Sequence, residues 1–186
     1  MKIPSAVFCV FFFACSSPDV KSKNTIDSTS ISKAIDSTQE EEREPDYRRG
    51  YIETYSKKIL IDTAFTQEGK KCRVIFNHFC TMDSNLVVPA KYNFDTKKDF
   101  VTHNFESDLI LIQEKDTLFK KQVTKSDFNP VLYSALKQYA TLQSPFLELR
   151  NDSIFIHYSI SIPVTDVGIA ATIKFDKNGG FKVEDK

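Results

Sequence analysis

The sequence has 186 residues with 25 basic and 25 acidic side chains, so its formal net charge is zero. Without a field of one sign to attract phosphates, the chain is poorly suited to nucleic acid, and we exclude that class of partner. Only the residues from 51 onward are apolar enough to form a core, which predicts one domain of ordinary size.

The first fourteen residues join one lysine to a short apolar run, the layout of a bacterial secretory signal. The run is about twelve residues long, whereas a transmembrane helix needs roughly 20. Phe12, Phe13, Ala14 and Cys15 resemble the lipobox of bacterial lipoproteins, in which cleavage precedes a cysteine whose thiol carries the lipid. That resemblance implies a signal peptide over 1–14 and a membrane anchor on Cys15. Plain secretion and an uncleaved apolar N-terminus are the alternatives.

Residues 15–50 hold few apolar side chains among Ser, Thr, Lys and Asp, with a glutamate run at 40–42. Such a composition cannot bury enough surface to offset the entropy of ordering the chain. We therefore predict a disordered tether of about 35 residues, with a reach of roughly 30 to 35 Å. It would join the lipid on Cys15 to a single β-rich domain at 51–186.

The domain opens with two segments, 55–65 and 71–79, in which side chains alternate with period two, as in strands. Cys72 and Cys80 share one face of the second segment. In one straight strand they would lie roughly 26 Å apart, whereas a disulfide needs Cα atoms within ~7 Å. Export permits a disulfide, so a bridged pair around a chain reversal and two buried free thiols are both open.

The middle of the domain contains a loop, a hairpin and a helix. Residues 81–99 predict loop with one short strand. Residues 105–123 predict a hairpin whose first strand, apolar on both faces at 109–112, is central and covered on two sides. Asn129 and Pro130 are a helix-start signal before an apolar stripe at helical spacing, which predicts a helix over 130–142.

Two further hairpins complete the chain. The first joins 146–149 to 153–162, and the second joins 169–175 to 181–183 across a turn that contains two glycines. The fold class is therefore all-β or β-rich α+β. We expect an antiparallel sandwich or small barrel of about seven to eight strands with one helix.

Two segments carry a wider resemblance. Residues 116–128, a hairpin strand followed by Lys-Ser-Asp-Phe, and residues 165–179, Asp-Val-Gly before a strand and an Asp-Lys-Asn-Gly turn, are similar to small lipoproteins of unknown function in Bacteroidetes. The resemblance implies an envelope protein with a β-barrel-like domain. These families have no established catalytic residues that the resemblance could assign to this chain.

The sequence offers no strong chemical motif. His78, His103 and His157 are too far apart for a local metal motif, and we expect neither a metal nor a cofactor. His78 and Cys80 share a strand face, but two ligands at that spacing recur by chance. His157 with Ser159 and Asp166 would make a hydrolase constellation, although no Gly-x-Ser-x-Gly elbow accompanies it.

We therefore expect a noncatalytic binding or scaffolding lipoprotein of the bacterial envelope, on the outer membrane or the periplasmic face. Its contacts would be the membrane, through the lipid on Cys15, and an envelope protein partner. The first alternative is a small apolar-ligand carrier with a cavity enclosed by barrel strands. A hydrolase is the second alternative.

Overall fold

The computed structural model describes residues 46–93, 97–150 and 153–185. The predicted signal peptide at 1–14, the lipid site Cys15 and the tether as far as residue 45 lie outside these ranges. Within them the chain forms ten strands, all paired antiparallel, and short helices. The prediction of a β-rich antiparallel domain is confirmed, with more strands than the seven or eight expected.

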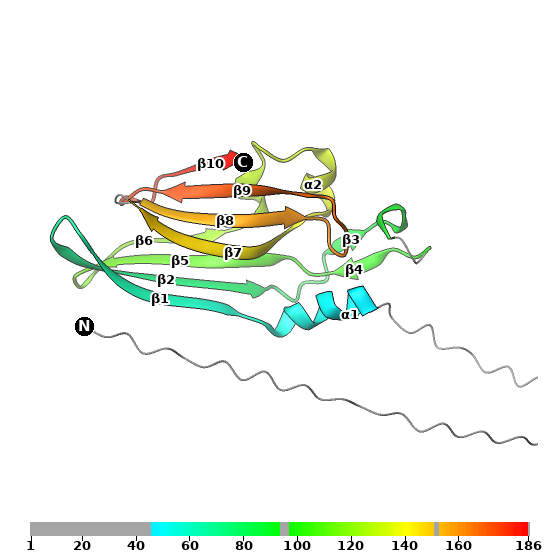
Figure 1. Ribbon diagram of the computed structural model, residues 1–186, viewed down its shortest axis with the longest axis horizontal. Helices are drawn as coiled ribbons and strands as arrows, with labels where there is room; N and C mark the ends of the chain where they lie inside the picture. Colours follow the sequence, from blue (N-terminus) through cyan, green and yellow to red (C-terminus); the bar gives the residue numbers. More distant parts are fainter. Residues whose placement is uncertain (1–45, 94–96, 151–152, 186) are drawn as a thin grey trace, which may run out of the picture. The chain divides into compact units, whose positions relative to one another are not determined.

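Two four-stranded sheets face one another as a sandwich and do not close into a barrel (Figure 1). The first sheet has the order β1-β2-β5-β6, with bounds Ile59–Gln67, Lys70–Cys80, Phe105–Gln113 and Asp116–Val123. The second has the order β10-β9-β8-β7, with bounds Phe181–Asp185, Gly168–Phe175, Ser153–Ser161 and Thr141–Arg150. Within each of these sheets, paired strands follow one another along the chain except β2 and β5, which a longer excursion separates.

That excursion holds a two-stranded ribbon of β3 (Leu86–Val88) and β4 (Phe100–Thr102), with the 3-10 turn η2 (Ala90–Tyr92) between them. The connection from β6 to the second sheet holds η3 (Lys125–Phe128) and α2 (Ser134–Tyr139), and α2 packs against β3 and β8. The helix α1 (Asp46–Ile52) and the turn η1 (Glu53–Ser56) lead into β1. These short elements lie around the sandwich rather than within it.

The core lies between the sheets because alternate side chains of each strand point inward. Val74, Phe76 and Leu109 from the first sheet are fully buried, as are Ile156 and Ile173 from the second. Alternation thus predicted both the hairpins and their buried faces. The interior is filled by side chains of one continuous cluster.

One side of the sandwich is closed by aromatic contacts between β6 and the β9–β10 hairpin. The rings of Phe119 and Phe175 stack with centroids 5.9 Å apart. The ammonium group of Lys121 lies 4.8 Å from the ring centroid of Phe181. The opposite side lies between β1 and β7, the two outer strands that appear nearest the viewer in Figure 1.

Three expectations need correction. The helix expected over 130–142, with a start signal at Asn129 and Pro130, is shorter at both ends, because α2 begins only at Ser134 and the chain enters strand β7 at Thr141. Part of the expected tether, from Asp46 to Gly50, is helical, since Arg48 is buried with its guanidinium 4.8 Å from the Phe100 ring centroid. Strand β5 is central but covered on its inner face alone, because Ile110 and Ile112 are only half-buried on the outer face.

Candidate binding cleft

The open side of the sandwich is bounded by β1 in one sheet and β7 in the other. Each is the outermost strand of its sheet, with a strand neighbour on one side alone within the described residues. Two hollows line up along this side. One lies where both strands begin, and the other where both strands end. We call this side, with its two hollows, the cleft.

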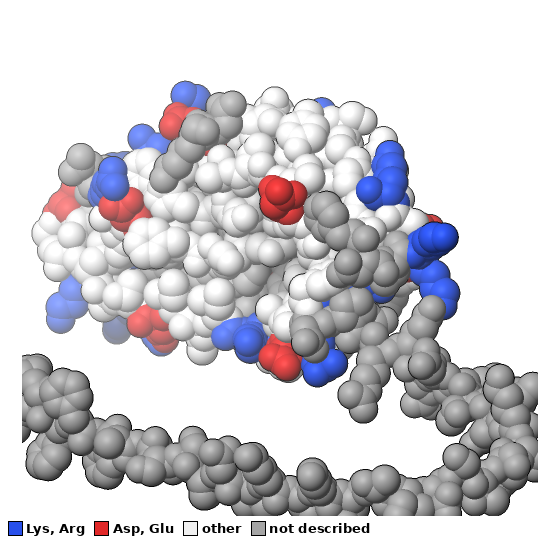
Figure 2. Space-filling model, turned by 45° about the vertical axis from the view of Figure 1, so that its right-hand side comes forward, with Lys and Arg blue, Asp and Glu red and all other residues white. Residues whose placement is uncertain are grey.

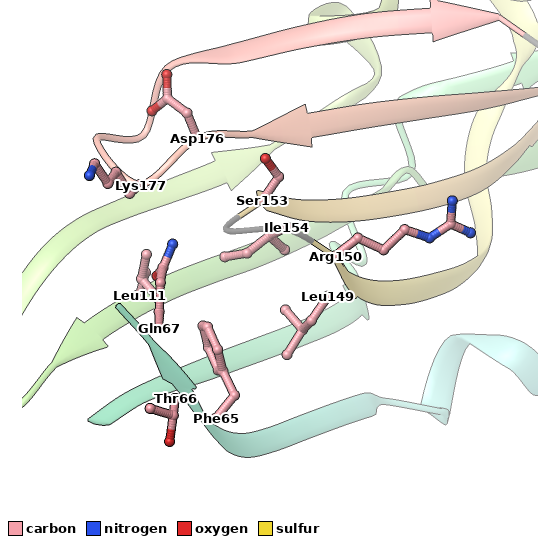
Figure 3. A pocket seen from close by; sticks show the side chains of 10 residues that line it. All are labelled: Phe65, Thr66, Gln67, Leu111, Leu149, Arg150, Ser153, Ile154, Asp176 and Lys177. Atoms are coloured by element: carbon pink, nitrogen blue, oxygen red, sulfur yellow. The ribbon is translucent and has the colours of Figure 1, made fainter. Parts of the chain in front are cut away.

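The hollow at the ends of β1 and β7 has a volume of about 280 Å³. In Figure 3, Phe65 and Leu149 point into the same space between the two strands. Leu111 and Ile154 complete its apolar wall. These four apolar residues share the lining of the hollow with six polar or charged ones, so a bound group would contact both kinds of surface.

The three charged residues that line this hollow already have partners. The Lys177 ammonium lies 3.2 Å from Glu68 Oε1, and the Arg150 guanidinium donates to Glu148. The Asp176 carboxylate accepts from the backbone amides of the turn that follows it, at 2.8 and 2.9 Å. Because these charges already have partners, shape and apolar contact would largely decide which ligand binds in this hollow.

The hollow at the starts of β1 and β7 has a volume of about 200 Å³. Ile59, Phe105 and Leu142 form its apolar wall, and Tyr51 of α1 closes one side. Lys57 lines it as well, and so does the buried His78. This hollow is thus apolar with one buried titratable ring at its base.

A buried chain of polar groups supports that ring. The hydroxyl of Tyr158 in β8 donates to Ser107 Oγ of β5 at 2.8 Å, and Ser107 Oγ lies 2.9 Å from His78 Nδ1. Burial lowers the pKa of His78 to about 4, against the opposing effect of a hydrogen bond to the Glu106 backbone. His78 is therefore neutral at pH 7, so its Nδ1 can accept the Ser107 proton.

A bulge in β7 shapes the cleft between the two hollows. The pairing of β7 with β8 shifts register between Gln143 and Phe146, and Ser144 within the bulge has a φ of 46°. Pro145 is tolerated there because β7 is an edge strand and needs no donor on its outer side. The shift moves the inward position from Leu142 to Leu147 and leaves Phe146 63% exposed on the outer face.

The residues weighed for hydrolysis do not assemble. His157 Nδ1 lies 2.8 Å from Thr172 Oγ1, and its Nε2 lies 3.3 Å from Glu148 Oε2. No hydrogen bond among the described residues joins His157 to Ser159 or Asp166. The His157 ring stacks on exposed Phe146 with centroids 5.9 Å apart, so the described contacts do not bring the three residues together.

The cysteines and the remaining histidine have structural surroundings. Cys72 and Cys80 are free, buried thiols near the two ends of the uninterrupted strand β2. Of the two alternatives, the disulfide is therefore wrong and the two free thiols are confirmed. His103 Nδ1 accepts the Ser84 amide at 2.8 Å. His78 stacks on Phe105 rather than pairing with Cys80, and no cluster of three potential metal ligands occurs within 46–93, 97–150 and 153–185.

Sequence reasoning found the inward faces of the strands but missed the cleft. The alternation of Ile59, Ile61 and Phe65 predicted a buried face, whereas Ile59 is 37% exposed and the others are half-buried. The sequence did contain one sign of this partial exposure, the polar Thr63 within that row. Its meaning depends on the strand order, which a single sequence does not give.

The surface around the sandwich carries scattered charges of both signs. Figure 2 shows a broad uncharged area, interrupted near its centre by one acidic side chain, with other charges toward the margins. Among the residues described, no helix has the length and apolar character required to cross a bilayer.

No known family model matches the chain, and no curated protein matches it either.

Proposed function

We propose that this chain is a noncatalytic binding lipoprotein of a bacterial envelope, held to the membrane by a lipid on Cys15, with the cleft as its binding site. The observation that carries the binding role is the exposure of inward-facing side chains along β1, opposite those of β7, while the β6–β10 side is packed shut. Apolar surface left open in an otherwise filled core is a common property of interaction sites.

The sequence supports the anchoring role through the resemblance of residues 12–15 to a lipobox. Tethering confines the domain near its membrane and raises the effective concentration of a partner there. The test is metabolic labelling with a clickable fatty acid. Wild-type chain should take up the label and Cys15→Ser should not. An unlabelled wild-type chain would contradict the membrane anchor but would not bear on the binding role of the cleft.

Site-specific photo-crosslinking tests the binding role in intact cells. A photoreactive amino acid at Thr63 faces the cleft, whereas one at the adjacent Ala64 lies on the exposed outer face of the same strand. We expect Thr63 to give a discrete adduct, identified by mass spectrometry, that Ala64 does not give. Equal labelling from both positions would contradict a binding role for the cleft.

A small apolar-ligand carrier is the second candidate, favoured by the hollow of about 280 Å³ beside Phe65 and Leu149. It differs from the carrier expected from the sequence, because the interior between the sheets is filled and the hollow opens at one end. Native mass spectrometry of the purified protein should then detect a retained small molecule. Leu149→Trp would fill the hollow and abolish that retention.

A further inference from the structure

We infer that the occupant of the cleft is an extended peptide strand that adds to the outer edge of β1, which pairs with no other strand within 46–93, 97–150 and 153–185. This conclusion rests on the proposed binding role. An edge strand presents a row of unpaired backbone N–H and C=O groups. A peptide that pairs with this row would become the fifth strand of the β1-β2-β5-β6 sheet and cover the open side of the core.

Strand β1 is the edge best suited to this pairing. It pairs with β2 over nine consecutive residues without a register shift, and it contains no proline. Its one charged residue, Asp62, points to the outer face and is held there by Arg73. Proteins commonly protect exposed edges with bulges, prolines or inward-pointing charges, and β1 has none of these.

The other three edges of the two four-stranded sheets are less suited to strand addition. Strand β7 carries the bulge with Pro145 and a positive φ at Ser144. Strand β6 pairs with β5 through an irregular register, and its Phe119 ring lies against Gly179 of the β9–β10 turn. Strand β10 has five residues. Strand addition is therefore directed to β1.

The side chains along the cleft define the chemistry of the peptide. Every second residue of β1 faces the cleft and is partly exposed, namely Ile59, Ile61, Thr63 and Phe65. An added strand has the same period, so every second side chain would enter the space between this row and Leu147 and Leu149 of β7. Because the surroundings are mainly apolar, those entering side chains should be apolar.

The length of the cleft also favours a peptide over a lipid chain. Nine strand residues span about 30 Å, and the two hollows lie at the two ends of that span. Apolar side chains near each end of a peptide of similar length would fill both hollows. A lipid chain would contact the same apolar walls but leave the edge of β1 without hydrogen bonds.

The test uses a panel of synthetic nonapeptides with Val, Ile, Leu or Phe at every second position and Thr between them. Peptides of the same composition with clustered apolar residues serve as controls, and lauric acid serves as the lipid probe. Binding is measured by calorimetry on the full chain with Cys15→Ser. Backbone amide exchange is followed by NMR, because strand addition protects alternate amides of β1 and side-chain docking does not.

We expect an alternating peptide to bind and to protect alternate β1 amides. Thr63→Glu, which points a charge into the cleft, should weaken binding about tenfold or more, whereas Ala64→Glu on the outer face should change it less than about twofold. Thr63 is already polar and half-exposed, so the folded state should tolerate the glutamate. Ile61→Glu provides a second charge in the cleft.

Binding without slowed exchange in β1 would overturn strand addition, and so would failure of every alternating peptide to bind. If the peptides fail while Thr63 still crosslinks a protein in cells, strand addition fails and the proposed binding role stands. If lauric acid binds and no peptide does, the cleft belongs to a small-ligand carrier, and both the peptide inference and the partner-binding role fail.

Discussion

Gly179 lies against the ring of Phe119, so closely that a Cβ on the glycine would come within 2.9 Å of Phe119 Cβ and Cγ. The contact joins the β9–β10 turn of one sheet to the edge strand β6 of the other. It is part of the packing that closes one side of the sandwich while the β1–β7 side stays open. The same glycine has a φ of 81°, in the left-handed region that favours glycine.

Gly179→Ala should therefore destabilise the domain in two ways, through backbone strain and through displacement of the Phe119 ring. We expect a loss of about 2–4 kcal/mol in the free energy of unfolding, measured by urea titration. Gly69 is the matched control, since it has a φ of 78° but open space around its Cβ position. Gly69→Ala should cost about 1 kcal/mol, from strain alone. Equal losses at both sites would show that the Phe119 contact contributes nothing.

Asp83 fixes the loop after β2 by accepting hydrogen bonds from the Asn104 side chain at 2.8 Å and the Asn104 amide at 3.1 Å. Burial alone would raise the pKa of Asp83, but these bonds, with those from Asn85 and Thr81, lower it to about 2. The native carboxylate thus holds its charge below the pH at which the unfolded one is protonated. Its contribution is complete above about pH 5 and is lost as the pH falls toward 2.

Asp83→Asn should lower the free energy of unfolding at pH 7 by about 1 kcal/mol, allowing for solvent screening of this half-buried group. It should also flatten the loss of stability between about pH 4 and 2. Unfolding in urea across that pH range checks both expectations. Asp166→Asn, at an exposed bend, leaves Asp83 and its hydrogen bonds in place, so the loss of stability between about pH 4 and 2 should persist.

The histidine at the base of the cleft predicts a second pH dependence at milder acidity. Unfolded His78 titrates near pH 6.5, whereas the native ring has a pKa of about 4 because burial disfavours its charged form. Between these values the unfolded state binds more protons, so stability is complete above about pH 6.5 and falls as the pH drops toward 4. The full penalty is roughly 3 kcal/mol.

His78→Gln should remove much of that slope between about pH 5 and 6.5, even if it lowers stability at every pH. Urea unfolding at half-unit pH intervals gives the measurement. His103→Gln changes a half-buried histidine elsewhere and leaves His78 in place, so the slope should persist. A slope that survives His78→Gln would assign the pH dependence to other groups.

The pattern of residues along each segment predicted the hairpins, because a hairpin depends mainly on residues close together in the sequence. The hairpins around Glu114 and Gly179 follow from period-two alternation and turn chemistry, and both form. The helix before β7 was predicted too long: Leu132 and Leu136 are both buried at helical spacing, yet Leu132 lies before the helix, which begins at Ser134 and ends at Tyr139. There the pairing of β7 with β8 overrides the local preference.

Tertiary contacts explain what the sequence did not reveal. The helix α1 reads as polar tether, and its place in the fold depends on Arg48 above Phe100 and on Tyr51 against Phe105. The cleft depends on which strands end up at the edges, so alternation in β1 predicted a buried face where a half-open one exists. Neither relationship is contained in the spacing of residues along one segment.

The hydrogen-bonded chain from Tyr158 through Ser107 to His78 joins the two sheets through their shared core. Mutation can measure how much it contributes to the free energy of unfolding. Tyr158→Phe removes one donor and should cost about 1 kcal/mol. Ser107→Ala leaves both the Tyr158 hydroxyl and His78 Nδ1 buried without this partner, which should cost about 2–4 kcal/mol. The double variant should lose less than the sum, because the phenylalanine no longer needs a partner. Strict additivity in urea unfolding would show that the two sheets gain nothing from this chain.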